Sequence, residues 1–275
     1  MKISSRVLLI IRNEKLFVAV QVLLFLLCCT IVLIATSALP LVHSGDMSVL
    51  FLGLLSCAGS FFVTYLFVRW NAMPLASSGV SFNRNFAVHL GFGFLAGTAI
   101  LGAQWAAMWA CGHVHWERSP VVSMTTMTTT ITAFIFLSAR EEIAFHGFAL
   151  RQLSAHFGLW PAQLGISIMF ALEHVAGGNS WLNALAGAGM GSLLFGMAAI
   201  ATRGLAIPVG MHAAWNTGDW LRGGKTAPGA WHPVIDPGYE SYVQISGLLT
   251  YMLLVAVATS GFWMLYRARQ LTDQA

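Results

Sequence analysis

Two adjacent glutamates stand at the end of an uncharged, apolar run that is typical of a membrane helix. Glu141 and Glu142 belong to a chain of 275 residues that has only ten Asp and Glu residues. Charged side chains at membrane depth are costly and rare, so they are by default candidates for function. Two histidines, His174 and His212, lie inside other apolar segments. Carboxylates and imidazoles together in apolar segments predict chemistry inside a bilayer.

The spacing of these residues assigns them to helical faces. Glu142 and His146 are four residues apart and share a face, whereas Glu141 points about 100° away. One carboxylate can therefore face a cavity while the other is held by a partner. His212 and Asn216 are also four residues apart, which places an imidazole and an amide on one face of a later helix.

These groups suit the hydrolysis of a peptide bond, which needs a base to activate water and donors for the oxyanion. Glu141 or Glu142 would take the proton, His174 would orient the water, and His212 and Asn216 would stabilise the negative charge.

A glutamate with two histidines also matches the ligand set of a catalytic zinc ion. On that alternative Glu141, His174 and His212 would hold the metal. The cofactor is therefore open between none and zinc, because the spacing does not separate a metal mechanism from a glutamate-activated water.

The elements that must position these residues are membrane helices. The chain is 57% hydrophobic and 9% charged, against about a quarter charged in soluble domains. Basic residues are scattered at helix ends and form no patch, so the expected surroundings are the lipid bilayer and no nucleic acid is expected as a partner. A span needs roughly 20 apolar residues. We expect eight transmembrane helices, at about 17–40, 48–69, 87–111, 120–140, 161–178, 181–202, 204–221 and 242–266.

The predicted fold class is thus all-α, a polytopic membrane helix bundle that forms a single membrane-embedded domain over residues 1–275. The fourth helix has no breaker before Gly158, so it is expected to continue past the bilayer edge. Small residues spaced four apart, Gly93 with Gly97 and Gly187 with Gly191, predict close helix packing.

The distribution of Lys and Arg predicts the orientation. With the N-terminus inside, the cytoplasmic segments collect eleven Lys and Arg residues, Arg140 among them, and the outer loops collect three. Both termini of this multi-pass cell-membrane protein are therefore expected in the cytoplasm. The outer loop 222–241 is rich in Gly and Pro and is expected to be irregular. His113 and His115 are expected in another solvated outer loop, without further metal ligands.

Over roughly residues 125–220 the chain resembles the CPBP intramembrane proteases, which include the CAAX-processing endopeptidases and the bacterial Abi-type proteins. The matches to the family's EExxxR, FxxxH and HxxxN motifs are Glu141 with Glu142, Phe170 with His174, and His212 with Asn216. The resemblance implies an intramembrane endopeptidase that acts on a membrane-associated protein or peptide. It also implies that the first glutamate and the histidines form the catalytic centre, with or without a metal.

The chain departs from the family pattern at one position, where His146 replaces the arginine of EExxxR. Arginine would be a permanent counter-charge to Glu142, whereas histidine gains and loses its charge near neutral pH. The departure indicates a divergent subgroup, an altered pH optimum or a member that has lost catalysis.

Other functions remain as rivals to proteolysis. The main alternative is a non-catalytic membrane scaffold or immunity-type protein of the same fold. A proton-coupled transporter would use Glu141, Glu142 and His146 as a relay, but the internal repeat typical of such transporters is missing from the sequence. Haem ligation by His174 and His212 would leave the paired glutamates unexplained. Whether a substrate is prenylated is left open.

Overall fold

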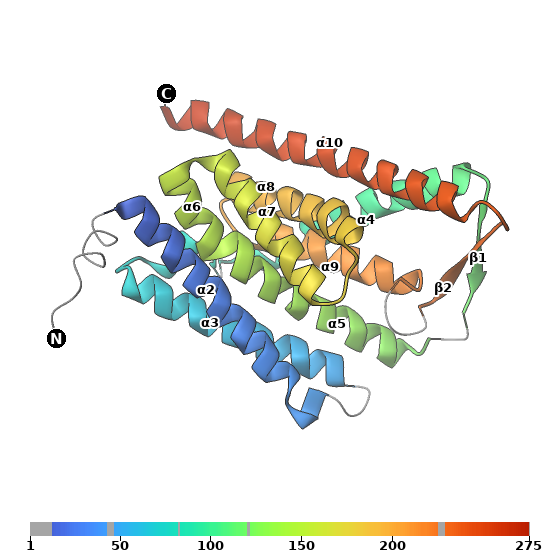
Figure 1. Ribbon diagram of the computed structural model, residues 1–275, viewed down its shortest axis with the longest axis horizontal. Coiled ribbons are helices and arrows are strands. Elements are labelled where there is room, and N and C mark those ends of the chain that lie inside the picture. Colours follow the sequence, from blue (N-terminus) through green and yellow to red (C-terminus); the bar gives the residue numbers. More distant parts are fainter. Residues whose placement is uncertain (1–12, 43–46, 82, 120–121, 225–228, 275) are drawn as a thin grey trace.

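The computed structural model describes residues 13–42, 47–81, 83–119, 122–224 and 229–274. These residues form a bundle of long helices with one small β-ribbon (Figure 1). The helices are α2 (Glu14–Ser37), α3 (Ser48–Trp70), α4 (Phe86–Ala110), α5 (Met124–Glu141), α6 (Leu150–Phe157), α7 (Leu159–Ala176), α8 (Met190–Ala201), α9 (Ala206–Leu221) and α10 (Glu240–Gln274). Two π-helical segments, η3 (Glu142–Ala149) and η4 (Asn183–Gly189), precede α6 and α8. Short 3-10 turns are η1 (Pro40–Val42) and η2 (Leu75–Ser78), and the strands are β1 (Val114–Arg118) and β2 (Trp231–Ile235).

The all-α membrane bundle predicted from the sequence is confirmed, and each predicted helix has a counterpart. The fourth predicted helix does continue beyond residue 140, through η3 into α6. By length and composition, α2, α3, α4, α10 and the helix formed by η4 and α8 are apolar and long enough to cross a membrane. The helices that carry the candidate residues differ: α5 begins with a threonine-rich stretch, α7 has Glu173 and His174 near its C-terminal end, and α9 has only 16 residues.

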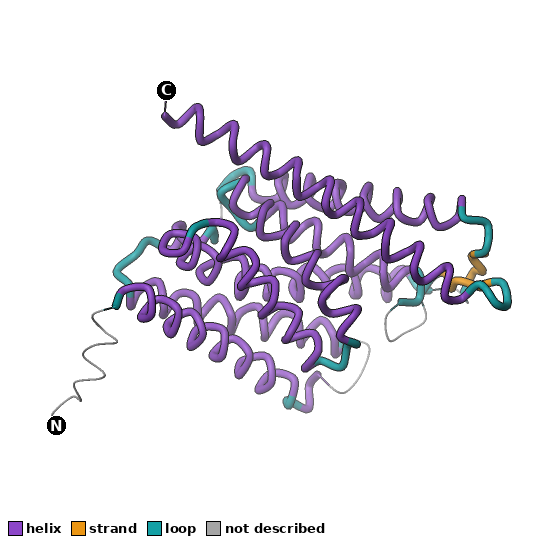
Figure 2. The backbone as a smooth tube through the Cα atoms, turned by 45° about the horizontal axis from the view of Figure 1, so that its top comes forward, coloured by secondary structure: helices purple, strands orange, loops and turns teal. Residues whose placement is uncertain are grey.

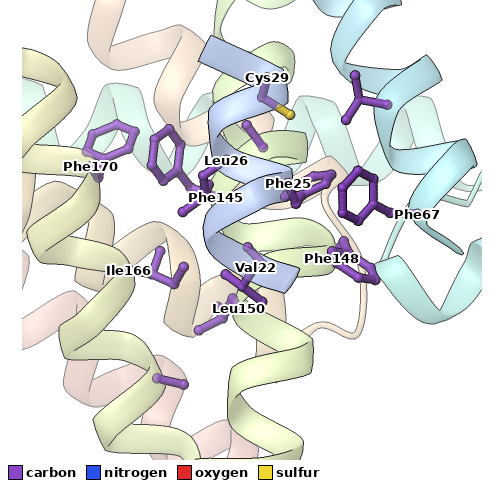
Figure 3. Close-up of a cluster of buried hydrophobic side chains, with 14 of the residues drawn as sticks. Val22, Phe25, Leu26, Cys29, Phe67, Phe145, Phe148, Leu150, Ile166 and Phe170 are labelled. Atoms are coloured by element: carbon purple, nitrogen blue, oxygen red, sulfur yellow. The ribbon is translucent and has the colours of Figure 1, made fainter. Parts of the chain in front are cut away.

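A cluster of buried aromatic rings holds α2 and α3 against η3 (Figure 3). The ring centroid of Phe25 lies 5.2 Å from that of Phe67 and 5.0 Å from that of Phe148. Phe145 packs edge-on against Phe170 of α7, with centroids 5.0 Å apart. Edge-to-face pairs each add about 0.5–1.5 kcal/mol beyond the area that they bury. The cluster therefore fixes η3 between the N-terminal helices and α7.

Small residues bring the backbones of α4 and α9 into direct contact. A Cβ atom added to Gly93 would lie 2.1 Å from the carbonyl oxygen of Ile207, and one added to Gly210 would lie 2.1 Å from that of Leu90. A Cβ at Gly97 would meet the next turn of α9 at 2.6 Å. The packing predicted from the Gly93 and Gly97 spacing is therefore confirmed, and it seats α9 at a fixed depth.

The expectation of an irregular outer loop over 222–241 was wrong for Trp231–Ile235, because this segment pairs with Val114–Arg118 in an antiparallel ribbon at one end of the bundle (Figures 1 and 2). Val114 pairs with Ile235 and Arg118 with Trp231. β-branched and aromatic residues in both segments favour strands, and each segment lacks a partner until the fold brings the other beside it. His113 and His115 contact Asp236 through ring nitrogens 3.1 and 3.3 Å from its carboxylate oxygens, so they belong to this ribbon.

The first turn of α2 and the last turn of α10 lie at the same end of the bundle, opposite the ribbon (Figure 1). Several residues used in the orientation argument lie outside the described residues, namely Lys2, Arg6, Arg12 and Lys225. The first two residues of the predicted helix 120–140 also lie outside them.

Candidate active site

Glu142 is fully buried and has two histidine partners. Its Oε2 lies 2.7 Å from Nδ1 of His146, and its Oε1 lies 2.8 Å from Nδ1 of His212. A carboxylate only accepts hydrogen bonds, so both Nδ1 atoms donate. Nε2 of His146 is 2.9 Å from the hydroxyl oxygen of Ser192, which completes its bonding. The predicted shared face of Glu142 and His146 is confirmed, and Glu142 is the carboxylate with both oxygens held by imidazoles.

Glu141 differs from its neighbour because one of its oxygens has no hydrogen-bond partner among the described residues. Oε1 accepts from Nη2 of Arg140 at 2.8 Å. The free atom, Oε2, lies 3.5 Å from Nε2 of His212. His212 therefore sits between the two glutamates, donating to one and facing the other. In the neutral ring this Nε2 is an acceptor, so two acceptors face each other, an arrangement that a water molecule can satisfy by donating to both.

His174 approaches the same place from α7. Its Nδ1 donates to the carbonyl oxygen of Phe170 at 2.9 Å, which leaves Nε2 as an acceptor in the neutral ring. The Phe170 ring lies 4.5 Å from the ring of His174 and 6.2 Å from that of His212, measured between centroids. Phe195 stacks on the His212 ring, with centroids 4.6 Å apart. Aromatic rings thus fix both imidazoles.

A cavity of about 740 Å³ opens beside these histidines. His174, His212 and Asn216 all line it, as the predicted shared face of His212 and Asn216 requires. Nδ2 of Asn216 also donates to Ser138 Oγ at 3.1 Å, which orients the amide. The two glutamates lie behind this wall, in contact with His212.

Most of the rest of the cavity wall comes from α4, η4, α8 and α10, and much of it is apolar. Its apolar residues include Met108, Leu182, Leu194, Phe195, Leu248 and Val255. Gly187 also lines it, and a Cβ added there would meet no atom within 4 Å. The predicted packing role of Gly187 was therefore wrong, because the glycine faces open space. Gly191, its partner in the motif, approaches a side chain, with its added Cβ 3.1 Å from the Tyr251 hydroxyl.

A zinc ion held by Glu141, His174 and His212 is the alternative to a metal-free site. Among the described residues, no three His, Cys, Asp or Glu side chains are arranged to hold a metal ion. Nδ1 of His174 donates to a backbone carbonyl and Nδ1 of His212 donates to Glu142, which leaves Nε2 of each neutral ring as an acceptor. Glu141 shares one oxygen with a guanidinium. Zinc bound by Glu141, His174 and His212 stays a prediction that chelation can test.

Sequence reasoning missed Arg140, which was assigned to the cytoplasmic residues that set topology. Its side chain is only 5% exposed and forms ion pairs with Glu141 and Glu173. The topology count did not anticipate this burial, because the second partner, Glu173, lies on another helix. The signal available in the sequence was an arginine directly before two glutamates.

The turn that carries Glu142 and His146 has unusual backbone geometry. η3 is π-helical, all eight of its residues are buried, and Gly147 departs from helical geometry with φ −82° and ψ −114°. A Cβ at Gly147 would lie 3.2 Å from the carbonyl oxygen of Ser78. π-helical turns are rare and often occur at functional sites. The distortion lets η3 run through the protein interior between α3 and α7.

Comparison with known proteins gives one family. Residues 123–218 match the family model described as type II CAAX prenyl endopeptidase, Rce1-like. No curated protein matched the chain. The matched segment begins at Ser123, the N-cap of α5, and ends within α9. It contains Arg140, the glutamate pair and every other candidate residue. The segment that builds this site therefore matches the Rce1-like type II CAAX prenyl endopeptidase model, in agreement with the motifs.

Proposed function

We propose that this protein is an intramembrane endopeptidase that hydrolyses a peptide bond in a membrane-associated substrate, with Glu141 as the general base. The observation that carries the proposal is the bridging position of His212, which contacts both glutamates and lines the cavity. The position of His212 gives the two glutamates different roles. Glu142 holds imidazoles with both of its oxygens, whereas Glu141 keeps Oε2 for a proton.

In the proposed reaction, Oε2 of Glu141 takes a proton from a water molecule that His174 orients through Nε2. The water oxygen forms a bond to the scissile carbonyl carbon, and the π electrons of the carbonyl move to its oxygen. The oxyanion accepts a hydrogen bond from the Asn216 amide. The protonated Glu141 then gives its proton to the leaving nitrogen as the carbon–nitrogen bond breaks. The products are an acid and an amine.

The substrate proposal follows from the cavity and the family. The apolar wall suits a lipid-modified or membrane-anchored peptide, and the matched family name specifies prenylated CAAX proteins. A farnesylated peptide that ends in a CAAX sequence is therefore the first probe, and the same peptide without the farnesyl group is the second. The proposed location is the cell membrane with both termini cytoplasmic. The common end of α2 and α10 supports this, as does the Lys and Arg asymmetry, which is ten to three once the buried Arg140 is left out.

The test is product release from these peptides by the purified full-length chain, followed by mass spectrometry. Glu141→Gln is expected to lower the rate by about 100-fold or more, the usual effect of losing a general base. Glu117→Gln is the matched control, because Glu117 is 63% exposed on the ribbon. Release by wild type that persists unchanged in Glu141→Gln would exclude this role. Failure of wild type on both peptides, together with a cellular phenotype that Glu141→Gln still rescues, would favour the non-catalytic scaffold.

A further inference from the structure

Arg140 is a buried cation that joins the two helices on which the proposed chemistry depends. Nη2 donates to Glu141 Oε1 at 2.8 Å, and Nη1 donates to Glu173 Oε1 at 2.7 Å. Glu141 ends α5, and Glu173 lies on α7 directly before His174. One guanidinium therefore spans the gap between the proposed base and the residue next to the proposed water-orienting histidine.

The geometry of this contact restrains Glu141. A carboxylate that accepts from a guanidinium at one oxygen has its plane and its second oxygen directed by that bond. In Glu141 the second oxygen is the one that faces His212. A guanidinium is planar and holds its donors in a fixed fork, whereas the lysine ammonium is a point charge on a flexible stem. Arginine therefore fixes the orientation of the Glu141 carboxylate more tightly than lysine would.

A contribution to folding stability does not explain why Arg140 forms buried ion pairs with Glu141 and Glu173. Removing charges from water costs several kcal/mol per ion, and well-packed apolar residues often replace a buried ion pair without loss of stability. Arg151 is a useful contrast, because its guanidinium donates to the carbonyl oxygen of Ala199 and takes part in no ion pair among the described residues. Arg140 differs because both of its carboxylate partners belong to the site or adjoin it.

We infer that Arg140 is a positioning residue, which aims the free oxygen of Glu141 and keeps α7, with His174, in register with it. The inference rests on the proposed function, since it concerns the same site. Arg140 makes no contact with substrate in this scheme and acts through Glu141. Its loss should therefore lower turnover and leave substrate affinity nearly unchanged.

The first experiment measures kcat and KM of the full-length chain on the farnesylated peptide. Arg140→Met is expected to lower kcat by about 100-fold, the usual scale for misplacing a catalytic group by about 1 Å. KM should stay within a factor of about three, because Arg140 makes no uniform contribution to substrate binding. Arg140→Lys should recover part of the loss in kcat. Arg151→Met is the matched control and should keep wild-type kcat.

Either of two results would overturn the inference: unchanged kcat in Arg140→Met, or a change confined to KM. If Arg140→Met does not fold, Arg140→Lys and Glu173→Gln carry the test. Both should lower kcat with KM preserved, and wild-type kcat in both would overturn the inference.

A second measurement separates this inference from the proposed function. If wild type cleaves neither peptide, the proposed function fails, and the restraint by Arg140 is then read from thermal unfolding. Arg140→Lys should lower Tm in the wild-type background and change it much less in the Glu141→Gln, Glu173→Gln background, because the contacts are shared. Equal shifts in both backgrounds would show that the guanidinium does not restrain these carboxylates.

Discussion

His146 and Glu142 form a completely buried pair, with Nδ1 of the imidazole 2.7 Å from Oε2 of the carboxylate. Histidine stands here at the arginine position of the family motif. The imidazole does more than replace a counter-charge, because its other nitrogen reaches Ser192 on α8. The pair thus connects η3 to a helix that walls the cavity.

The first prediction concerns this position. His146→Arg should keep peptide hydrolysis, because arginine also donates to Glu142 and the nearby side chain of Gln163 has an unpartnered oxygen that can accept from it. His146→Ala should lose most activity, since a buried carboxylate loses a charge-assisted bond. Rates on the farnesylated peptide, with Tm recorded for each variant, make the comparison. A folded but inactive His146→Arg would mean that the contact with Ser192 is required.

Substitutions of the two glutamates should affect stability and turnover differently when both quantities are measured on the same samples. Glu142→Gln should lower stability by roughly 3–5 kcal/mol, because it disrupts a buried carboxylate that two imidazoles hold. Glu141→Gln should lower turnover by about 100-fold or more, with a smaller fall in Tm because its Oε2 forms no hydrogen bond in the described residues. Thermal unfolding and peptide release make the test. The reverse ranking of stabilities would assign the base to Glu142.

Packing of α4 on α9 supplies a prediction with an internal control. Gly93→Ala should destabilise the protein by about 1–3 kcal/mol, because the new methyl group overlaps the backbone of α9. Gly91→Ala, on the same helix, meets no atom within 4 Å and should leave Tm nearly unchanged. Activity should follow Tm, since α9 carries His212. Equal tolerance of the two substitutions would contradict the close approach of these helices.

Cavity access can be tested at Gly187. Gly187→Leu places a side chain in open space on the cavity wall and should raise KM for the farnesylated peptide while Tm changes little. Gly165→Leu is the control, because Gly165 also has open space around its Cβ position but does not line the cavity. A KM that stays at the wild-type value in Gly187→Leu would show that substrate binds elsewhere.

Metal removal distinguishes the two mechanisms that the motifs allow. With a glutamate-activated water, dialysis against a zinc chelator should leave the rate of peptide release unchanged. Loss of activity that zinc restores would instead favour a metal held by Glu141, His174 and His212. The control is a known zinc peptidase treated in the same dialysis.

Periodicity and hydropathy predicted the helices well, because each apolar run is a local property of the chain. The shared faces of Glu142 with His146 and of His212 with Asn216 also followed from helical spacing alone. Arg140 did not follow, because its partner Glu173 is 33 residues away on another helix. A hydropathy argument assigns such an arginine to the membrane surface, since it contains no term for a buried carboxylate partner.

The ribbon and the π-helical turn were missed for similar reasons. β1 and β2 are separated in sequence by five helices, so neither segment carries the evidence for its own pairing. η3 has the composition of an ordinary apolar helix, and its distortion arises where Gly147 passes close to the backbone of η2. Both features depend on contacts that form only in the folded chain.

The position of His212 between the glutamates has a consequence for any kinetic dissection of the site. Substituting His212 removes a donor to Glu142 and a neighbour of Glu141 at the same time. The free-energy effects of changes at these three residues will therefore not sum, and a double-mutant cycle should return a large interaction energy for each pair. The three side chains function as one thermodynamic unit, to which no single residue contributes a separable share.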